Sequence, residues 1–76
     1  MVSPHDRRYQ VLLKRLREAR LAAGLTQVEV AKRLGLIQPL ISRIETGERK
    51  IDPIEFADIC RLYGKGARYF LPDLPV

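Results

Sequence analysis

Side chains that build metal sites, disulfides and active sites are scarce in this chain of 76 residues, which has one cysteine, one histidine and no tryptophan. Cys60 has no second cysteine to pair with, and with His5 it falls short of the roughly three or four ligands that a zinc site needs. A glycine-rich phosphate loop and a recognisable pair of catalytic carboxylates are also missing. We therefore expect no metal, no other cofactor and no enzymatic activity.

Long apolar runs are missing as well, because the longest ones, such as residues 11–13, extend over only a few positions. Neither a membrane-spanning helix nor a cleavable signal is predicted, and we expect a cytoplasmic protein. Apolar residues nevertheless make up 46% of the chain, too many for a disordered polymer. This length leaves room for one hydrophobic core, so residues 1–76 are expected to form a single domain without a separate small-molecule effector domain.

Positive charge is what the chain has in excess. Fourteen Lys and Arg stand against nine Asp and Glu, which gives a net charge of +5. The excess lies in residues 1–50, because residues 51–76 hold three basic and four acidic side chains. A basic chain favours polyanionic partners, and the absence of tryptophan disfavours a membrane surface. Nucleic acid is therefore the predicted partner.

Helix signals recur along the chain, whereas strand signals do not. Helices are predicted at about residues 4–23, 27–34, 38–46 and 53–63. A short helical turn is predicted at residues 67–71, within a C-terminal tail of residues 65–76. The signals that start and stop them are N-caps at Ser3, Thr26 and Asp52, prolines at Pro4 and Pro53, acids at Asp6, Glu29 and Glu55, and the glycines Gly24, Gly35 and Gly47.

Apolar residues at three- and four-residue steps define the expected core faces of these helices. They are Tyr9, Leu12, Leu13, Leu16, Ala19 and Ala23 in the first, Val30 and Leu34 in the second, Ile41 and Ile44 in the third, and Phe56, Ile59, Cys60 and Tyr63 in the fourth. The arginines between residues 7 and 20 lie mostly outside the first face. They are expected to contribute electrostatic field rather than specific contacts.

Residues 27–46 contain two short helices that only residues 35–37 separate. So short a connection makes the helices cross steeply, because it cannot reverse the chain into a long hairpin. Ala31 lies one turn before Gly35, so its small side chain allows a close approach, and Gly35 can adopt a positive φ. The spacing predicts a helix-turn-helix.

The residues of this pattern resemble the Cro-type, lambda-repressor-like helix-turn-helix family of bacterial and phage regulators, over about residues 12–64. They are Gly24, Leu25, Thr26, Gln27, Ala31, Gly35, Ile41, Ser42, Arg43, Ile44, Glu45 and Gly47. The resemblance implies a compact all-α domain of four to five helices, whose third helix enters the major groove of DNA while the second lies across the backbone. It also implies an ion pair between Arg20 and Glu45.

The same resemblance implies which side chains contact DNA. Gln38, Pro39, Ser42 and Arg43 would face the bases, where glutamine can pair with adenine and arginine with guanine. Gln27 matches a phosphate-binding position. The full predicted set is Gln27, Gln38, Pro39, Ser42, Arg43, Thr46, Arg49 and Lys50. For the last two, ordinary solvated charge is an equally good interpretation.

Two positions depart from the family pattern. Ile37 stands where a hydroxyl residue commonly caps the recognition helix, and Leu40 stands where a small or polar residue is common. Three hypotheses follow: the two side chains contact thymine methyl groups, or they fold back against the domain, or the surface has changed towards a protein partner.

The sequence therefore predicts a transcriptional regulator that binds double-stranded DNA as a homodimer on a palindromic or pseudo-palindromic operator. Its length resembles that of small phage repressors and of controller proteins of restriction–modification systems. The predicted dimer interface is Tyr63, Tyr69, Phe70 and Leu71. The alternative is an antitoxin or other protein-interaction module built on the same domain.

Overall fold

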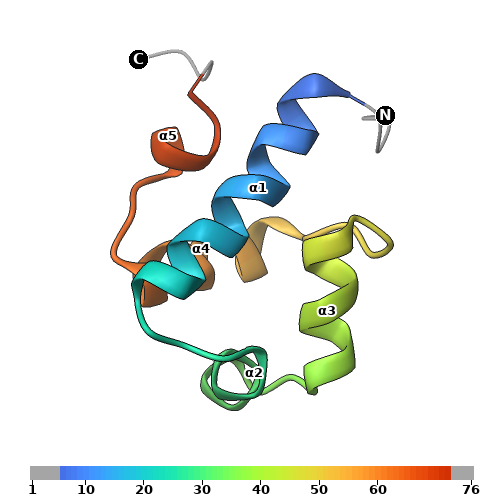
Figure 1. Cartoon of the computed structure of the whole chain (residues 1–76), viewed down its shortest axis with the longest axis vertical. Helices are drawn as coiled ribbons and strands as arrows, with labels where there is room; N and C mark the ends of the chain where they lie inside the picture. The colour runs from blue at the N-terminus through green and yellow to red at the C-terminus, as the bar shows by residue number, and fades with distance from the viewer. Residues whose placement is uncertain (1–5, 73–76) are drawn as a thin grey trace.

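The computed structural model describes residues 6–72, and every regular element in that range is a helix. Figure 1 shows the five helices: α1 (Arg7–Ala22), α2 (Gln27–Leu34), α3 (Gln38–Thr46), α4 (Pro53–Tyr63) and α5 (Ala67–Phe70). The all-α class is confirmed, and α2, α3 and α4 have the bounds that the sequence predicts. None of the helices in this part of the chain is long and apolar enough to cross a membrane.

The start of α1 differs from the prediction. Asp6 has extended backbone angles, φ −60° and ψ 131°, and its carboxylate accepts a hydrogen bond of 2.8 Å from the backbone N–H of Arg8. Asp6 is therefore the N-cap and not the third residue of the helix, because aspartate caps as well as serine does. Its ion pair with Arg8 lowers its pKa to about 2. The predicted cap at Ser3 and the proline after it lie outside the described residues.

The predicted capping boxes begin α2 and α4. Thr26 Oγ1 accepts from the backbone N–H of Glu29 at 3.1 Å, and Glu29 Oε1 accepts from the backbone N–H of Thr26 at 3.0 Å. Asp52 and Glu55 repeat this exchange at 2.8 and 3.2 Å. At the other end of α2, Gly35 has φ +69°, the left-handed conformation that the turn requires. These local signals account for the agreement in bounds.

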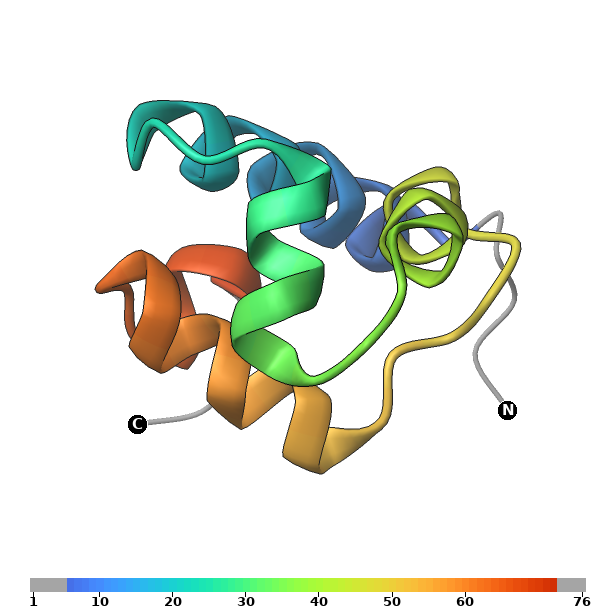
Figure 2. The ribbon, with the colours of Figure 1, turned by 90° about the horizontal axis from the view of Figure 1, so that it is seen from below.

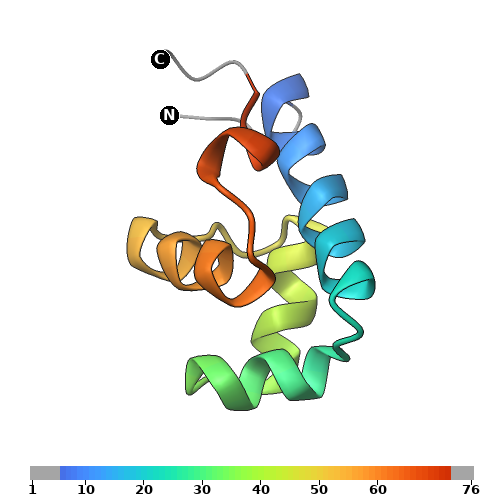
Figure 3. The ribbon, with the colours of Figure 1, turned by 90° about the vertical axis from the view of Figure 1, so that its left-hand side faces the viewer.

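The core forms where α1 packs against α3 and α5 and where α2 packs against α3 and α4. Figure 3 shows α1 running along one side of the molecule. Its buried apolar members are Tyr9, Leu12, Leu13, Leu16, Ala19, Val30, Ala31, Ile41, Ile44, Ile59, Tyr63 and Phe70. Ala23 was expected among them but is exposed, because α1 ends before it. Phe56 and Cys60 are only half-buried.

The crossing of α2 and α3 is steep. Figure 1 shows α2 end-on and α3 lengthwise, and Figure 2, from below, shows the reverse. Ala31, from the side of α2 that faces the core, is 3% exposed. The predicted helix-turn-helix is therefore present.

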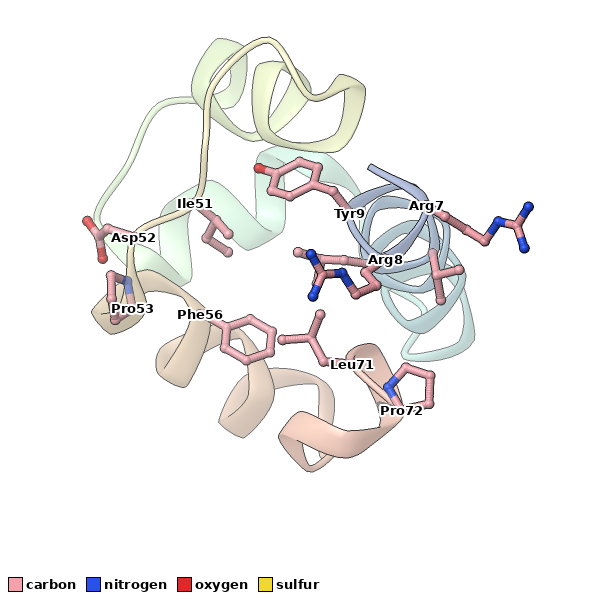
Figure 4. Close-up of a pocket in the computed structure, with 11 residues that line it drawn as sticks. Arg7, Arg8, Tyr9, Ile51, Asp52, Pro53, Phe56, Leu71 and Pro72 are labelled. Carbon is pink, nitrogen blue, oxygen red and sulfur yellow. The ribbon is translucent and has the colours of Figure 1, made fainter. Parts of the chain in front are cut away.

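An apolar groove of about 530 Å³ lies between the first half of α1, the start of α4 and the chain after α5 (Figure 4). The residues that line it include Val11, Ile51, Phe56 and Leu71 and the charged Arg8.

Candidate nucleic-acid interface

Helix α3 presents a polar and basic face outward. Ile41 and Ile44 on its inner face are each 2% exposed and anchor the helix to the core. On the opposite face, Pro39, Arg43 and Thr46 are exposed and Ser42 is half-buried. The four follow at three- and four-residue steps and form one stripe, which we call the outer face of α3. These are four of the side chains for which the sequence predicts DNA contacts.

The first residues of α2 and α3 meet through their side chains. Gln38 Nε2 donates a hydrogen bond of 2.7 Å to Gln27 Oε1, although the two residues are 11 positions apart. Gln38 keeps its Oε1 and a second N–H without a partner among the described residues. An acceptor and a donor side by side are what a bidentate contact with the N6 and N7 edge of adenine requires.

Gln27 is itself held by a hydrogen bond to Glu45. Its Nε2 donates to Glu45 Oε1 at 3.1 Å, so its oxygen and its nitrogen both have partners inside the chain. The family resemblance implies that Gln27 contacts a phosphate directly. In the structure, Gln27 holds the side chain of Gln38 through a hydrogen bond. One amide N–H of Gln27 is left for a phosphate oxygen.

The ion pair that the resemblance implies is present and buried. Arg20 Nε lies 2.7 Å from Glu45 Oε2, and the side chains are 9% and 7% exposed. Arg20 also donates to Glu45 Oε1 at 3.2 Å and to the carbonyl of Leu25 at 3.0 Å. Four side chains thus form a continuous polar network from α1 to the start of α3: Arg20, Glu45, Gln27 and Gln38. Nothing in the spacing of the sequence predicts the link through Gln27, because its partners lie 11 and 18 positions away.

The basic residues near the end of α3 differ in their freedom. Arg43 is exposed, and its guanidinium has no partner among residues 6–72. Lys50 is exposed to solvent as well. Arg49 instead donates two hydrogen bonds of 2.8 Å to the carboxylate of Glu55. This pairing raises the pKa of Arg49 and lowers that of Glu55. The phosphate contact of Arg49 stays a prediction, and its ion pair with Glu55 would compete with a phosphate for the guanidinium.

Thr46, another predicted contact, points its hydroxyl back along its own helix. Its Oγ1 donates to the carbonyl of Arg43 at 3.2 Å. The proton of the hydroxyl is used there, so the oxygen can only accept a further hydrogen bond. This residue is less suited to a phosphate, which offers acceptors, than its exposure suggests.

The two unusual apolar residues have different surroundings. Ile37 is the N-cap of α3, makes no side-chain cap hydrogen bond and is 62% exposed. Leu40 is half-buried. The hypothesis that both fold back against the domain therefore fails for Ile37.

The four residues predicted to form a dimer interface differ in their burial. Tyr63 and Phe70 are 8% and 0% exposed inside the chain's own core, which removes them from the surface open to a partner. The desolvation of Tyr63 raises its pKa to about 12. Tyr69 has cations over its ring, with Arg15 and Lys65 at 5.4 and 4.8 Å from its centroid. Leu71, half-buried, lies in the apolar groove.

Comparisons with known proteins agree with this geometry. A family model described as a helix-turn-helix domain matches residues 11–67. Among solved structures, the chain is similar to an XRE-family like protein from Pseudomonas syringae pv. tomato str. DC3000. The two are 50% identical with a TM-score of 0.79, over 90% of this chain and 83% of that chain. No curated protein gives a significant match. On the family match and the solved relative, the chain belongs to the helix-turn-helix domain family.

Proposed function

We propose that the chain is a transcriptional regulator that binds specific sites in double-stranded DNA as a homodimer. The observation that carries this proposal is the contact between the starts of α2 and α3, where Gln38 donates one N–H to Gln27 and keeps its Oε1 and its second N–H for adenine. A glutamine fixed in this way loses little side-chain entropy on binding, which favours a defined base contact over a diffuse one. The net charge of +5 supplies attraction to the phosphates.

In the proposed complex, α3 lies in the major groove with its outer face against the bases. Gln38 pairs with adenine, and Arg43, which has no partner among the described residues, pairs with guanine O6 and N7. Lys50 and the first backbone N–H groups of α2 lie against the phosphates, to which helix N-termini are attracted.

The dimer is the second part of the proposal. Two copies related by a two-fold axis would place their α3 helices about 34 Å apart, one turn of DNA, and would read a palindromic or pseudo-palindromic operator. The apolar groove that contains Leu71 supports this part, because Val11, Ile51 and Phe56 beside it are apolar surface that a second copy can cover. Bound over a promoter, such a dimer would act as a repressor by competing with the polymerase.

Selection of bound sequences from random duplex DNA tests the proposal. A recurring motif with half-sites about one helical turn apart is the expected result. Should no sequence preference emerge, the regulator function fails and a protein-interaction module, such as an antitoxin, becomes the better explanation.

Two variants then separate base reading from phosphate attraction. Arg43→Ala should lose about 1–3 kcal/mol on the selected site and relax the preference at one base pair per half-site. Lys50→Ala should weaken selected and random duplexes alike, and lower the slope of log affinity against log salt by about one. Equal losses on all DNA for Arg43→Ala would make Arg43 a backbone contact.

A further inference from the structure

Basic side chains gather around the short helix α5. Residues 61–72 contain Arg61, Lys65 and Arg68 and no acidic residue. Lys65 and Arg68 are exposed. Arg15 of α1 reaches the same place, because its Nη1 donates a hydrogen bond of 2.6 Å to the carbonyl of Tyr69. We call Arg15, Lys65 and Arg68 the α5 cluster.

The ring of Tyr69 fixes the position of two of these cations. Lys65 Nζ lies 4.8 Å and Arg15 Cζ 5.4 Å from the centroid of the ring. The ring is itself held edge-on against Phe70, with 5.0 Å between the ring centroids, and Phe70 is fully buried. Cations that rest on a rigid support lose little side-chain entropy when they bind a ligand.

Carboxylates do not neutralise the α5 cluster within residues 6–72. The ion pairs in this range belong to other arginines, which are Arg8, Arg20 and Arg49. Two cations within 5.4 Å of one ring centroid repel each other, and the negative face of the ring offsets only part of this repulsion. An anionic partner would relieve the repulsion. A second copy placed against the same cluster would instead add like charges.

The α5 cluster and the outer face of α3 lie towards opposite ends of the molecule. Figures 1 and 3 show α5 towards the top, whereas α2 and the first turn of α3 lie at the bottom. The longest axis of the molecule, which is vertical in both views, extends over 31 Å. The major groove of DNA is only about 8.5 Å deep, so a duplex that takes in the start of α3 does not extend to α5.

We propose that the α5 cluster binds the phosphates of a second DNA duplex, so that the regulator holds two DNA segments together. Ammonium and guanidinium groups offer only donors, and phosphate oxygens only accept, so this contact is independent of base sequence. The proposal rests on the proposed function for the first duplex, which lies against α3. The second contact adds a binding site on the other side of the same domain.

Capture of a second duplex tests this proposal. A full selected duplex, which occupies both α3 helices of a dimer, is immobilised and saturated with protein, and a labelled random duplex is then added. The wild type should retain the labelled duplex with a Kd of about 10⁻⁴ to 10⁻⁶ M, the range of sequence-independent binding. Lys65→Gln combined with Arg68→Gln should still bind the immobilised duplex but should capture the second at least about tenfold more weakly. The salt slope of capture should fall by about two.

Two double variants serve as controls. Lys65→Arg with Arg68→Lys keeps both charges and should capture the second duplex as the wild type does. Lys32→Gln with Arg33→Gln removes two exposed charges from the last turn of α2, at the other end of the molecule, and should keep capture once the immobilised duplex is saturated. All the substituted side chains are exposed, so the melting temperatures should stay close to that of the wild type.

Three results would overturn the inference while leaving the proposed function intact. In the first, the wild type saturates the selected duplex but retains no labelled duplex. In the second, the glutamine variant at Lys65 and Arg68 captures as well as the wild type. In the third, the control at Lys32 and Arg33 loses as much capture, which would mean that capture follows net charge alone. Failure to select any preferred duplex would instead remove the proposed function.

Discussion

At the scale of single residues, Glu45 connects stability to recognition. Its carboxylate accepts hydrogen bonds from Arg20 and Gln27, and Gln27 in turn holds Gln38. A charged group buried at this depth is tolerated because its partner neutralises it and its oxygens are hydrogen-bonded. The same atoms that hold α1 to α3 therefore also orient the predicted adenine contact.

Replacing Glu45 by alanine should destabilise the fold strongly. The change leaves the guanidinium of Arg20 buried without a counter-charge, at a cost of about 3 kcal/mol. Urea unfolding should detect this as a lower midpoint. The exposed Glu48 offers a matched control, because Glu48→Ala removes a carboxylate from the surface and should shift stability by less than about 0.5 kcal/mol. An unchanged midpoint for Glu45→Ala would contradict the structure of this network.

For Tyr9, in contrast, we predict a substitution that keeps or raises the stability of the fold. Its ring belongs to the core, and its hydroxyl is buried without a hydrogen-bond partner among the described residues. An unpaired buried hydroxyl costs about 1–3 kcal/mol, so Tyr9→Phe should keep or raise the melting temperature. Calorimetry of the two proteins is the measurement, and a clear fall in melting temperature would mean that the hydroxyl has a partner.

At the scale of elements, the helix starts depend on ionised carboxylates. Glu29 accepts from the backbone of Thr26, and this hydrogen bond lowers its pKa. The ion pair with Arg49 lowers the pKa of Glu55, and Asp6 at the start of α1 has a pKa of about 2. Three of the four long helices thus begin at a carboxylate that favours its charged form in the folded state.

Acid should therefore weaken the fold in a defined range. A carboxylate whose pKa is lower in the folded state stabilises it above the unfolded value, near 4, and loses this effect as the pH falls towards the folded value. We expect the urea midpoint to hold from pH 7 to about 5 and to fall between about pH 5 and 2. Glu29→Gln and Glu55→Gln together should flatten this fall. A midpoint that rises on acidification would contradict the assignment.

At the scale of the whole molecule, the apolar groove and the outer face of α3 are separate surfaces. The groove lies between α1, α4 and the chain after α5, and the outer face belongs to α3 alone (Figures 1 and 4). In the proposed complex, one surface is therefore available for a second copy while the other lies against DNA. This separation is what a dimeric reader of two half-sites requires.

Sedimentation tests the dimer directly. At tens of micromolar, with and without the selected duplex, the wild type should sediment as a species of twice 8.7 kDa, or as two copies per duplex. Leu71→Asp places a charge in the groove and should shift this equilibrium towards monomer, with weaker binding to full operators than to half-sites. A wild type that remains monomeric in both conditions would count decisively against the dimer.

Local signals in the sequence determined the helices, because caps, prolines and glycine stops act over a few residues. They failed at α1, where Ser3 and Asp6 are competing caps within the same stretch. Periodicity also placed Pro39, Ser42, Arg43 and Thr46 on one helix face, since side-chain direction follows from helical spacing.

The partners of the polar side chains were decided only by the tertiary structure. Gln38 reaches Gln27, and Gln27 reaches Glu45, because the start of α2 lies beside α3, between its first and its last turn. No local spacing encodes such a contact. The pairing of Arg49 with Glu55 likewise depends on how the loop before α4 folds. Helical periodicity predicts which face of a helix a side chain occupies. Hydrogen bonds between helices depend on the distances between them, and the packing of the core sets those distances.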